Sequence, residues 1–281
     1  MKKAVIFGAS GTGMLLYPSL KEQYDIIYAT DNDPVFYNKV IWGGITVKDK
    51  AELSEKNYDC VVIASVSGLD EIYNQLIDEF KLNGSMIIRK HAELFVSAKN
   101  QFVESFAKIV YEKDIKGSVA EVGVFRGEFA KEINRVFHDR TLYLFDTFGG
   151  YDQRDIERDI ALGYRGIENE TILFKDTTPE LVLQKLPSRE KAVIKKGHFP
   201  ETFDLLDEAF CFINLDINFY STTLAALKLF YPLISKGGII LVHDYFSPYC
   251  PGVKAATDEF TKEHAISFMP IGDFLSIAII K

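Results

Sequence analysis

One stretch of the chain combines residue types that could bind a charged ligand: an acidic residue followed by two nearby glycines. It reads Glu121-Val122-Gly123-Val124-Phe125-Arg126-Gly127 and lies between an apolar strand-like run and a helical pattern. Glycines at such a turn let a ligand lie against the backbone, and a carboxylate can bind an ammonium group, directly or through water. Asp146 ends the next apolar run, nineteen residues after Gly127, where a carboxylate can accept hydrogen bonds from ribose hydroxyls. Together these features predict a site for S-adenosylmethionine, and the alternative is a Rossmann-like turn without this ligand.

The elements that must position these residues follow a βαβ pattern. Short apolar runs alternate with amphipathic stretches, as in parallel sheets with helices on both faces. The last two predicted strands, residues 266–270 and 274–280, are joined by only three residues, so they form a hairpin and the final strand runs antiparallel. We therefore predict an α/β fold with a class I methyltransferase Rossmann-like seven-stranded sheet, one strand of it reversed.

A smaller unit precedes this sheet. A strand at residues 3–7 leads into the glycine-rich turn at residues 8–13, and a second strand ends before Asp31. Such a turn lets a phosphate approach a helix N-terminus, although its GxxGxG spacing is not the dinucleotide fingerprint, and ligand binding and a purely structural turn both stay open. The stretch is similar to small N-terminal domains that precede sugar-modifying enzymes of surface-polysaccharide pathways and bind the nucleotide of a nucleotide-sugar.

The domain prediction has three parts. Residues 1–90 form a small Rossmann-like domain that binds a nucleotide or nucleotide-sugar. Residues 91–115 form a helical connector that packs on the second domain, and residues 116–281 form an S-adenosylmethionine-dependent methyltransferase domain. Two domains agree with a length of 281 residues, because single cores rarely grow beyond about 250 residues.

Composition excludes several classes of protein. With 32 basic and 40 acidic residues the formal charge is −8, which argues against a nucleic-acid partner. The three cysteines are scattered and odd in number, so neither a disulfide scaffold nor a zinc site is expected. No apolar run approaches the ~18 residues of a membrane span, and no cleavable signal pattern opens the chain. We expect a cytoplasmic protein without a membrane span.

Five ordered motifs between about residues 117 and 260 resemble the macrocin O-methyltransferase family. The motifs span residues 121–127, 146–150, 197–203, 215–222 and 237–245. This family comprises metal-dependent enzymes that methylate sugar hydroxyls on macrolide and aminocoumarin antibiotics, with relatives in polysaccharide clusters. The resemblance implies O-methylation of a sugar hydroxyl on a surface polysaccharide, glycan or nucleotide-sugar. The oligomeric state stays open between a monomer and a homo-oligomer. The resemblance further implies a set of cofactor-binding residues: Glu121, Gly123, Phe125, Arg126, Gly127, Asp146, Thr147, Gly197, His198 and Asp216.

The resemblance also implies a metal site formed by Asp216, His243 and Asp244. A divalent cation there would hold two neighbouring sugar oxygens and lower the pKa of one hydroxyl. His243 stands where the family has an aspartate, and an imidazole suits Mn²⁺ or other transition metals better than Mg²⁺, so the metal is open between Mg²⁺ and Mn²⁺. The alternative is that metal binding is lost and His243 is hydrogen-bonded to Asp244.

Asn218 departs from the family pattern at the position of the general base. An amide cannot accept the proton that a carboxylate would take. We therefore predict His243 and His198 as the nearest replacement bases. The alternative function is a catalytically weakened protein that binds S-adenosylmethionine or a nucleotide-sugar as a sensor or assembly partner. The polar segment 150–169 is interpreted as a lid over the site, or else as a solvated face.

Overall fold

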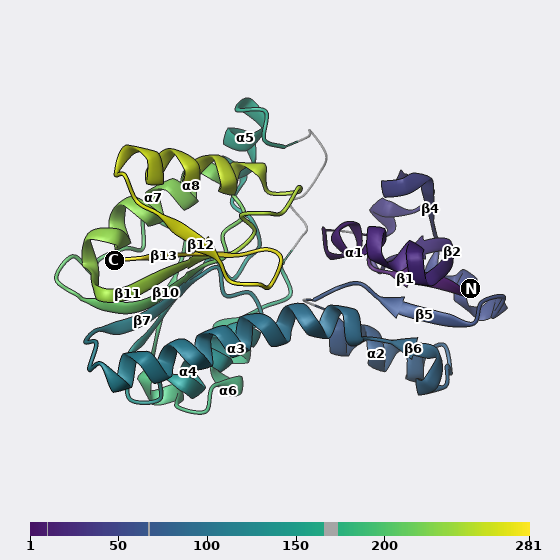
Figure 1. Cartoon of the computed structure of the whole chain (residues 1–281), viewed down its shortest axis with the longest axis horizontal. Helices are drawn as coiled ribbons and strands as arrows, with labels where there is room; N and C mark the ends of the chain where they lie inside the picture. Colours follow the sequence, from purple (N-terminus) through teal and green to yellow (C-terminus); the bar gives the residue numbers. More distant parts are fainter. Residues whose placement is uncertain (10, 67, 166–173) are drawn as a thin grey trace. The chain divides into compact units, whose positions relative to one another are not determined.

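The computed structural model describes residues 1–9, 11–66, 68–165 and 174–281. The chain divides into two compact units, Met1–Ser97 and Ala98–Lys281, and each unit has its own sheet (Figure 1). Among the described residues no helix has both the length and the apolar character needed to cross a bilayer. Residues 166–169, the end of the predicted lid, lie outside the described residues.

The first unit contains a six-stranded sheet in the order β3-β4-β2-β1-β5-β6. All neighbouring strands are parallel except β3 and β4. Apolar residues of β1 and β5 pack against helix α2 and form the core. The strands are β1 (Lys2–Phe7), β2 (Tyr24–Thr30), β3 (Val40–Ile41), β4 (Ile45–Lys48), β5 (Cys60–Ile63) and β6 (Ile87–Ile88), and the helices are α1 (Gly11–Gln23) and α2 (Leu69–Asp78).

The second unit contains the predicted seven-stranded sheet, in the order β12-β13-β11-β10-β7-β8-β9. The reversed strand is β13, which runs antiparallel to both β11 and β12, while the other neighbours are parallel. This confirms the predicted fold class. The strands are β7 (Ser118–Val122), β8 (Leu142–Asp146), β9 (Ala192–Lys196), β10 (Phe210–Leu215), β11 (Ile234–Val242), β12 (Phe268–Pro270) and β13 (Ile277–Ile280).

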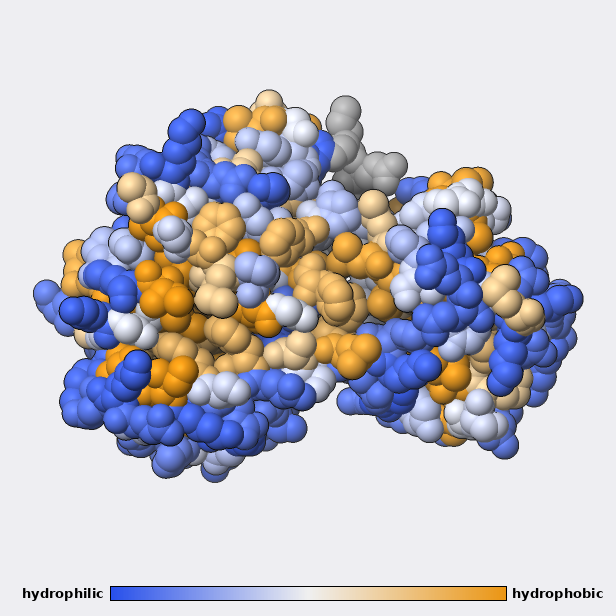
Figure 2. Space-filling model, viewed as in Figure 1, coloured by the Kyte–Doolittle hydropathy of each residue, from blue (hydrophilic) through white to orange (hydrophobic). Residues whose placement is uncertain are grey.

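Helices cover both faces of this sheet (Figure 1). Helices α3 (Lys90–Glu112), α4 (Glu128–Val136) and α6 (Pro179–Lys185) lie on one face, and α7 (Tyr220–Phe230) and α8 (Pro251–Glu263) lie on the other, together with the short α5 (Gln153–Ala161). Strand β10 is buried along its whole length, and its side chains alternate between two cores, with Phe212 in one and Ile213 in the other. Figure 2 shows hydrophobic residues between the two helical layers, along the sheet edge that β12 forms.

Helix α3 covers most of the predicted connector. The boundary between the two units falls inside this helix, between Ser97 and Ala98, rather than at residue 90 or 116. From Val103 onward its buried side chains belong to the core of the second unit, where Phe106 contacts Phe212 of β10 with 6.1 Å between ring centroids. The second half of α3 is therefore part of the second unit.

Candidate active site

The carboxyl ends of four neighbouring strands carry predicted site residues. Gly123 follows β7, Asp146 ends β8, Asp216 follows β10 and His243 follows β11. These strands are parallel and adjacent in the order β11-β10-β7-β8. Their ends therefore meet at one edge of the sheet, where open α/β sheets bind ligands.

Asp216, His243 and Asp244 form a compact cluster at this edge. Nδ1 of His243 lies 3.2 Å from Oδ1 of Asp216 and 3.2 Å from Oδ2 of Asp244. One ligand atom from each residue lies within 4.8 Å of the other two. Two ligands at about 2.1–2.3 Å from a cation and at right angles to each other are about 3.0–3.2 Å apart. The spacing of the cluster therefore matches ligands around one cation.

The Nδ1 atom of His243 supports this interpretation. It is buried and makes no hydrogen bond of acceptable geometry to any described residue, although two carboxylates are close. Burial disfavours the charged ring, but Asp216 and Asp244 outweigh this effect and raise the pKa of His243 to about 10. A positive charge is thus strongly favoured at this point, and a divalent cation would take the place of the ring proton. The residues present fit a divalent cation.

Lys99 completes the charges around the cluster, and the sequence interpretation missed it. Its Nζ lies 3.4 Å from Oδ2 of Asp216, and its side chain is 10% exposed. Burial disfavours the Asp216 carboxylate, yet His243 and Lys99 hold the pKa of Asp216 well below its usual range. The available signal was a lysine within the apolar stripe of α3, between Phe95 and Phe102 at helical spacing.

Glu121 presents a carboxylate oxygen without a partner. The residue is 2% exposed, and its Oε1 accepts a hydrogen bond from Nδ2 of Asn214 at 2.9 Å. Its Oε2 is buried and makes no hydrogen bond to the described residues. Burial, opposed in part by Lys99, raises the pKa of Glu121 to about 8. An ammonium group of a ligand would satisfy Oε2 and stabilise the charged form.

Contacts within the protein also require the glycines near the site, beside the cofactor contact that the sequence predicts for them. Gly123 has φ 85°, and a Cβ atom there would collide with the backbone carbonyl of Asp216. At Gly127, with φ 78°, a Cβ would lie 2.8 Å from Cγ1 of Val182. At Gly197, with φ 142°, it would lie 2.7 Å from Cγ2 of Thr202. The spacing of the glycines therefore reflects packing of the turn, and a cofactor contact is a separate proposal.

Asp146 holds the turn that follows β7. Its Oδ2 accepts hydrogen bonds from the backbone N–H groups of Val124 and Phe125 at 2.7 and 2.8 Å, and its Oδ1 accepts one from Phe148 at 2.7 Å. A carboxylate has about four acceptor positions, so one is left for a ribose hydroxyl. Thr147 is likewise engaged, because its hydroxyl donates to the carbonyl of Gly150 at 2.5 Å.

Phe125 and Arg126 contact the segment that leads into α6. The ring of Phe125 meets Phe174 edge to face, with 4.9 Å between centroids. The guanidinium of Arg126 forms an ion pair with Asp176, and the Thr177 hydroxyl donates to the Phe125 carbonyl. Both residues lie at the turn, as predicted, and their cofactor contacts stay a prediction.

Comparisons with known proteins extend these observations. A family profile described as macrocin-O-methyltransferase (TylF) matches residues 92–274, and one described as C2185-like, N-terminal, matches residues 1–88. The chain belongs to the macrocin O-methyltransferase family. The first profile covers α3 and nearly all of the second unit, so the family match and the site lie in the same part of the chain.

Two curated relatives share this part of the chain. Mycinamicin III 3''-O-methyltransferase of Micromonospora griseorubida is 27% identical over 169 residues, which are 54% of this chain and 63% of the relative. Demethyldecarbamoylnovobiocin O-methyltransferase of Streptomyces niveus is 25% identical over 173 residues, 56% of this chain and 63% of the relative. The chain thus spans about 63% of the length of these relatives.

Two solved structures show the same fold. The O-methyltransferase NovP superposes with a TM-score of 0.52 at 23% identity, over 66% of this chain and 79% of its own. The calicheamicin methyltransferase CalS11 superposes with a TM-score of 0.54 at 15% identity, over 82% of this chain and 92% of its own. These similarities agree with the predicted class I methyltransferase fold.

Asn218 departs from the family pattern, and both polar atoms of its side chain make hydrogen bonds. Its Nδ2 donates to the hydroxyl oxygen of Tyr151 at 2.9 Å, and the Cys250 thiol donates to its Oδ1 at 3.5 Å. Its backbone carbonyl accepts a hydrogen bond from Arg165 at 3.1 Å. The residue has φ 68°, a conformation that asparagine tolerates better than most residues. Asn218 therefore has the contacts of a fixed turn residue.

His198 has a partner outside the cluster. Its Nε2 lies 2.9 Å from Oδ2 of Asp155 on α5, and its Nδ1 lies 3.8 Å from Oε1 of Glu201. It follows β9, three strands from β10 in the sheet, which separates the ends of these strands by about 14 Å at ~4.8 Å per strand. Of the two histidines predicted as bases, His243 lies beside the Asp216 and Asp244 carboxylates, whereas His198 pairs with Asp155.

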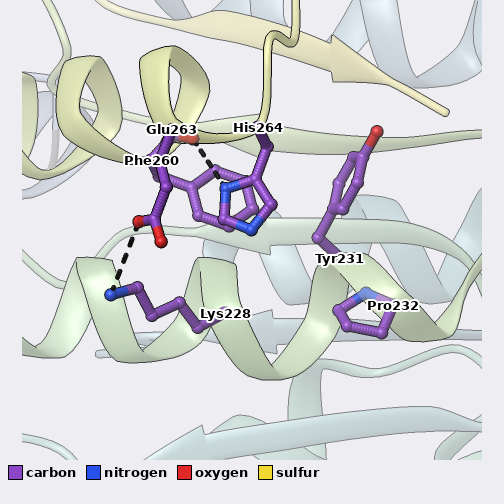
Figure 3. A pocket seen from close by; sticks show the side chains of 6 residues that line it. All are labelled: Lys228, Tyr231, Pro232, Phe260, Glu263 and His264. Carbon is purple, nitrogen blue, oxygen red and sulfur yellow. Dashed lines mark hydrogen bonds and ion pairs between the residues drawn. The ribbon is translucent and has the colours of Figure 1, made fainter.

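A surface hollow lies between the last turns of α7 and α8 (Figure 3). Helix α7 begins at the carboxyl end of β10 and returns across the sheet, so its last turn lies at the opposite end from the cluster. Its charged groups and its imidazole have partners within the protein, since Nζ of Lys228 lies 3.8 Å from Oε2 of Glu263 and Nδ1 of His264 lies 2.9 Å from the Phe260 carbonyl. The hollow therefore has no part in the candidate site.

Proposed function

We propose that this protein transfers a methyl group from S-adenosylmethionine to a hydroxyl oxygen of a sugar, assisted by a divalent cation. The observation that carries the proposal is the cluster of Asp216, His243 and Asp244 at the same sheet edge as Oε2 of Glu121, which has no hydrogen-bond partner among the described residues. The membership in the macrocin O-methyltransferase family supports methyl transfer to oxygen. The sugar acceptor follows from the resemblance to enzymes that methylate sugar hydroxyls.

The turn after β7 would hold the methionine part of the cofactor. Oε2 of Glu121 would accept a hydrogen bond from the cofactor ammonium, which supplies the partner that this buried oxygen lacks. Asp146 keeps the turn in place and has one acceptor position left for a ribose hydroxyl. These two carboxylates would orient the cofactor so that its methyl group faces the acceptor.

Asp216, Asp244 and Nδ1 of His243 would hold the cation. When bound, it would draw electron density from the acceptor hydroxyl and lower its pKa. With Nδ1 toward the cation, Nε2 of the neutral His243 ring carries the ring proton, so His243 would serve as a ligand and not as the base, and the proton of the acceptor would pass to solvent. The imidazole favours Mn²⁺ over Mg²⁺, because Mg²⁺ prefers oxygen ligands.

The first unit would bind a nucleotide or nucleotide-sugar beside its glycine-rich turn. Asp31, after β2, accepts hydrogen bonds from the backbone N–H groups of Ala9 at 2.7 Å and Asp33 at 3.0 Å. It therefore holds the turn after β1 as Asp146 does in the second unit, and about two acceptor positions remain for ribose. Calorimetry with UDP and UDP-sugars tests this: Asp31→Asn should weaken binding at least tenfold, and unchanged binding would contradict it.

The alternative function is a binding protein with little or no catalysis. The fixed amide of Asn218, in place of a carboxylate base, is the observation that favours it. Turnover decides between the two functions. We also infer a reducing compartment such as the cytoplasm, because Cys60, Cys211 and Cys250 are buried free thiols.

The test measures formation of S-adenosylhomocysteine with Mg²⁺ or Mn²⁺ and a panel of free and nucleotide-linked sugars. Asp216→Asn should lower turnover at least 100-fold, because it removes a charged ligand, and should leave cofactor affinity within about threefold by calorimetry. The exposed Asp207→Asn is the matched control and should keep full turnover. Failure of the wild-type protein to bind S-adenosylmethionine would refute the proposal, and binding without turnover on any sugar would favour the alternative.

A further inference from the structure

Lys99 is buried beside the cation site. It lies on α3, far in sequence from every motif that forms the site, and its Nζ is 3.4 Å from Oδ2 of Asp216. The same Nζ lies 4.1 Å from the centre of the Phe129 ring, which favours the charged ammonium in this position. Burying a lysine is costly unless it is paired, so this arrangement calls for an explanation.

The two oxygens of Asp216 have different partners. Oδ2 faces Lys99, and Oδ1 faces Nδ1 of His243 at 3.2 Å. Lys99 thus fixes the carboxylate by one oxygen and directs the other toward the position of the cation. The carboxylate is thereby prepared to act as a ligand through a single oxygen.

Lys99 also changes the charge that a cation would meet. Asp216 and Asp244 contribute −2, a neutral His243 contributes nothing, and the ammonium of Lys99 contributes +1, which leaves −1. A positive charge buried a few ångströms from a divalent cation repels it strongly, because screening by water is weak there. Without Lys99 the cation would therefore bind more tightly.

We propose that Lys99 is a positioning residue that holds Asp216 by Oδ2 and limits the affinity of the site for divalent cations. This inference rests on the proposed function of the same site. Limited affinity keeps the cation exchangeable and leaves part of its charge to be neutralised by the acceptor oxygen. The direction of the effect does not depend on the protonation of His243, since replacing one proton by a divalent cation still adds one positive charge.

The test is Mn²⁺ binding to the full chain, measured by electron paramagnetic resonance of free Mn²⁺ and by calorimetry. Lys99→Met should tighten Mn²⁺ binding at least tenfold, and Lys99→Arg, which keeps the charge, should stay within about threefold of wild type. Lys108→Met is the control, because Lys108 is exposed on the same helix and pairs with Glu104. The Lys108→Met variant should bind Mn²⁺ with the affinity of the wild-type protein.

Two outcomes would overturn the inference. One is that the folded Lys99→Met variant binds Mn²⁺ no more tightly than wild type. The other is that Lys99→Arg tightens Mn²⁺ binding as much as Lys99→Met does. Thermal unfolding checks the fold, and Lys99→Gln, which keeps a polar end, replaces the methionine variant if that variant does not fold. Binding of S-adenosylmethionine by the wild-type protein tests the proposed function separately, so failure of one is distinguishable from failure of the other.

Discussion

Three separate contacts converge on Asp216. Its backbone carbonyl occupies the space that a side chain at position 123 would need, its Oδ1 faces His243, and its Oδ2 faces Lys99. The first contact fixes the residue against the turn after β7, and the other two fix its carboxylate. The predicted cofactor turn and the predicted cation cluster are thus joined through a single residue, and neither can shift independently.

The buried carboxylate of Glu121 should lower the stability of the folded protein at alkaline pH and favour binding of S-adenosylmethionine. Its folded-state pKa, about 8, is raised above the ordinary 4.5, so its contribution to stability is lost as pH rises from about 4.5 through 8. Glu121→Gln does not titrate and keeps an acceptor for Asn214. It should therefore be more stable than wild type at pH 8.5, by about 1–3 kcal/mol, and no more stable near pH 4.5. Urea unfolding at the two pH values measures the difference.

The same variant should bind S-adenosylmethionine at least tenfold more weakly, because it loses a charge-assisted hydrogen bond. Glu112→Gln, an exposed change on α3, is the control for both measurements. A stability difference that is independent of pH, or an unchanged cofactor affinity, would show that Oε2 of Glu121 does not have the role proposed here.

The family resemblance implied Asp216, His243 and Asp244 as one metal site, and the structure brings their side chains together, while their role as ligands stays a prediction. Asp216, His243 and Asp244 each follow a recognisable apolar strand, and parallel strands bring such residues together. Lys99 could not be placed in the same way, because its contact with Asp216 spans 117 positions and depends on how α3 packs. The partners of Asp146 were also beyond the sequence, since backbone N–H groups leave no mark in residue types.

At the scale of elements, Gly127 shows how a turn and a helix pair depend on each other. It precedes α4, and a side chain there would press into Val182 of α6. Gly127→Ala should lower the free energy of unfolding by about 2–4 kcal/mol through strain at φ 78° and this overlap. In a Val182→Ala background the same change should cost about 1 kcal/mol less, which a double-mutant cycle measures by urea unfolding.

Gly149→Ala is the control for this cycle, because the nearest atom to its Cβ would be the Thr147 carbonyl at 3.9 Å, an ordinary contact. It should leave the free energy of unfolding within about 0.5 kcal/mol. Equal costs of Gly127→Ala in both backgrounds would show that strain at φ 78°, and not the overlap with Val182, sets the cost of a side chain at this position.

Helix α5 explains why one element was missed within an otherwise well predicted order. Residues 150–169 read as a polar segment, yet Gln153–Ala161 forms a helix whose buried face includes Asp155 and Asp159. The carboxylate of Asp159 accepts a hydrogen bond from the backbone N–H of Tyr220 at 3.1 Å, at the first turn of α7. Two of the three buried side chains of this helix are carboxylates and the third is Ile156, so its apolar stripe is too short for the periodicity on which sequence interpretation relies.

At the scale of the whole molecule, helix α3 is where the predicted division of the chain and the observed one differ. The sequence interpretation made residues 91–115 a helical connector that packs on the second domain, because nothing within the segment is Gly-, Ser- or Pro-rich. The structure divides the chain inside this helix, and the family profile begins at residue 92. Sequence periodicity identified the helix and its packing on the second domain, but only the structure could show which of its residues join that core.

This difference gives a prediction about the second unit. A fragment of residues 90–281 keeps all of α3, whereas a fragment of residues 116–281 lacks Val103, Phe106, Ala107 and Val110, which are buried in the core. Loss of each large core side chain costs about 2–5 kcal/mol, and domains of this kind have about 5–15 kcal/mol in total. The longer fragment should therefore unfold cooperatively and bind S-adenosylmethionine within about threefold of the full chain, and the shorter one should do neither. Circular dichroism melts and calorimetry on both fragments and the full chain decide this, and cooperative unfolding of the shorter fragment would show that α3 is a dispensable connector.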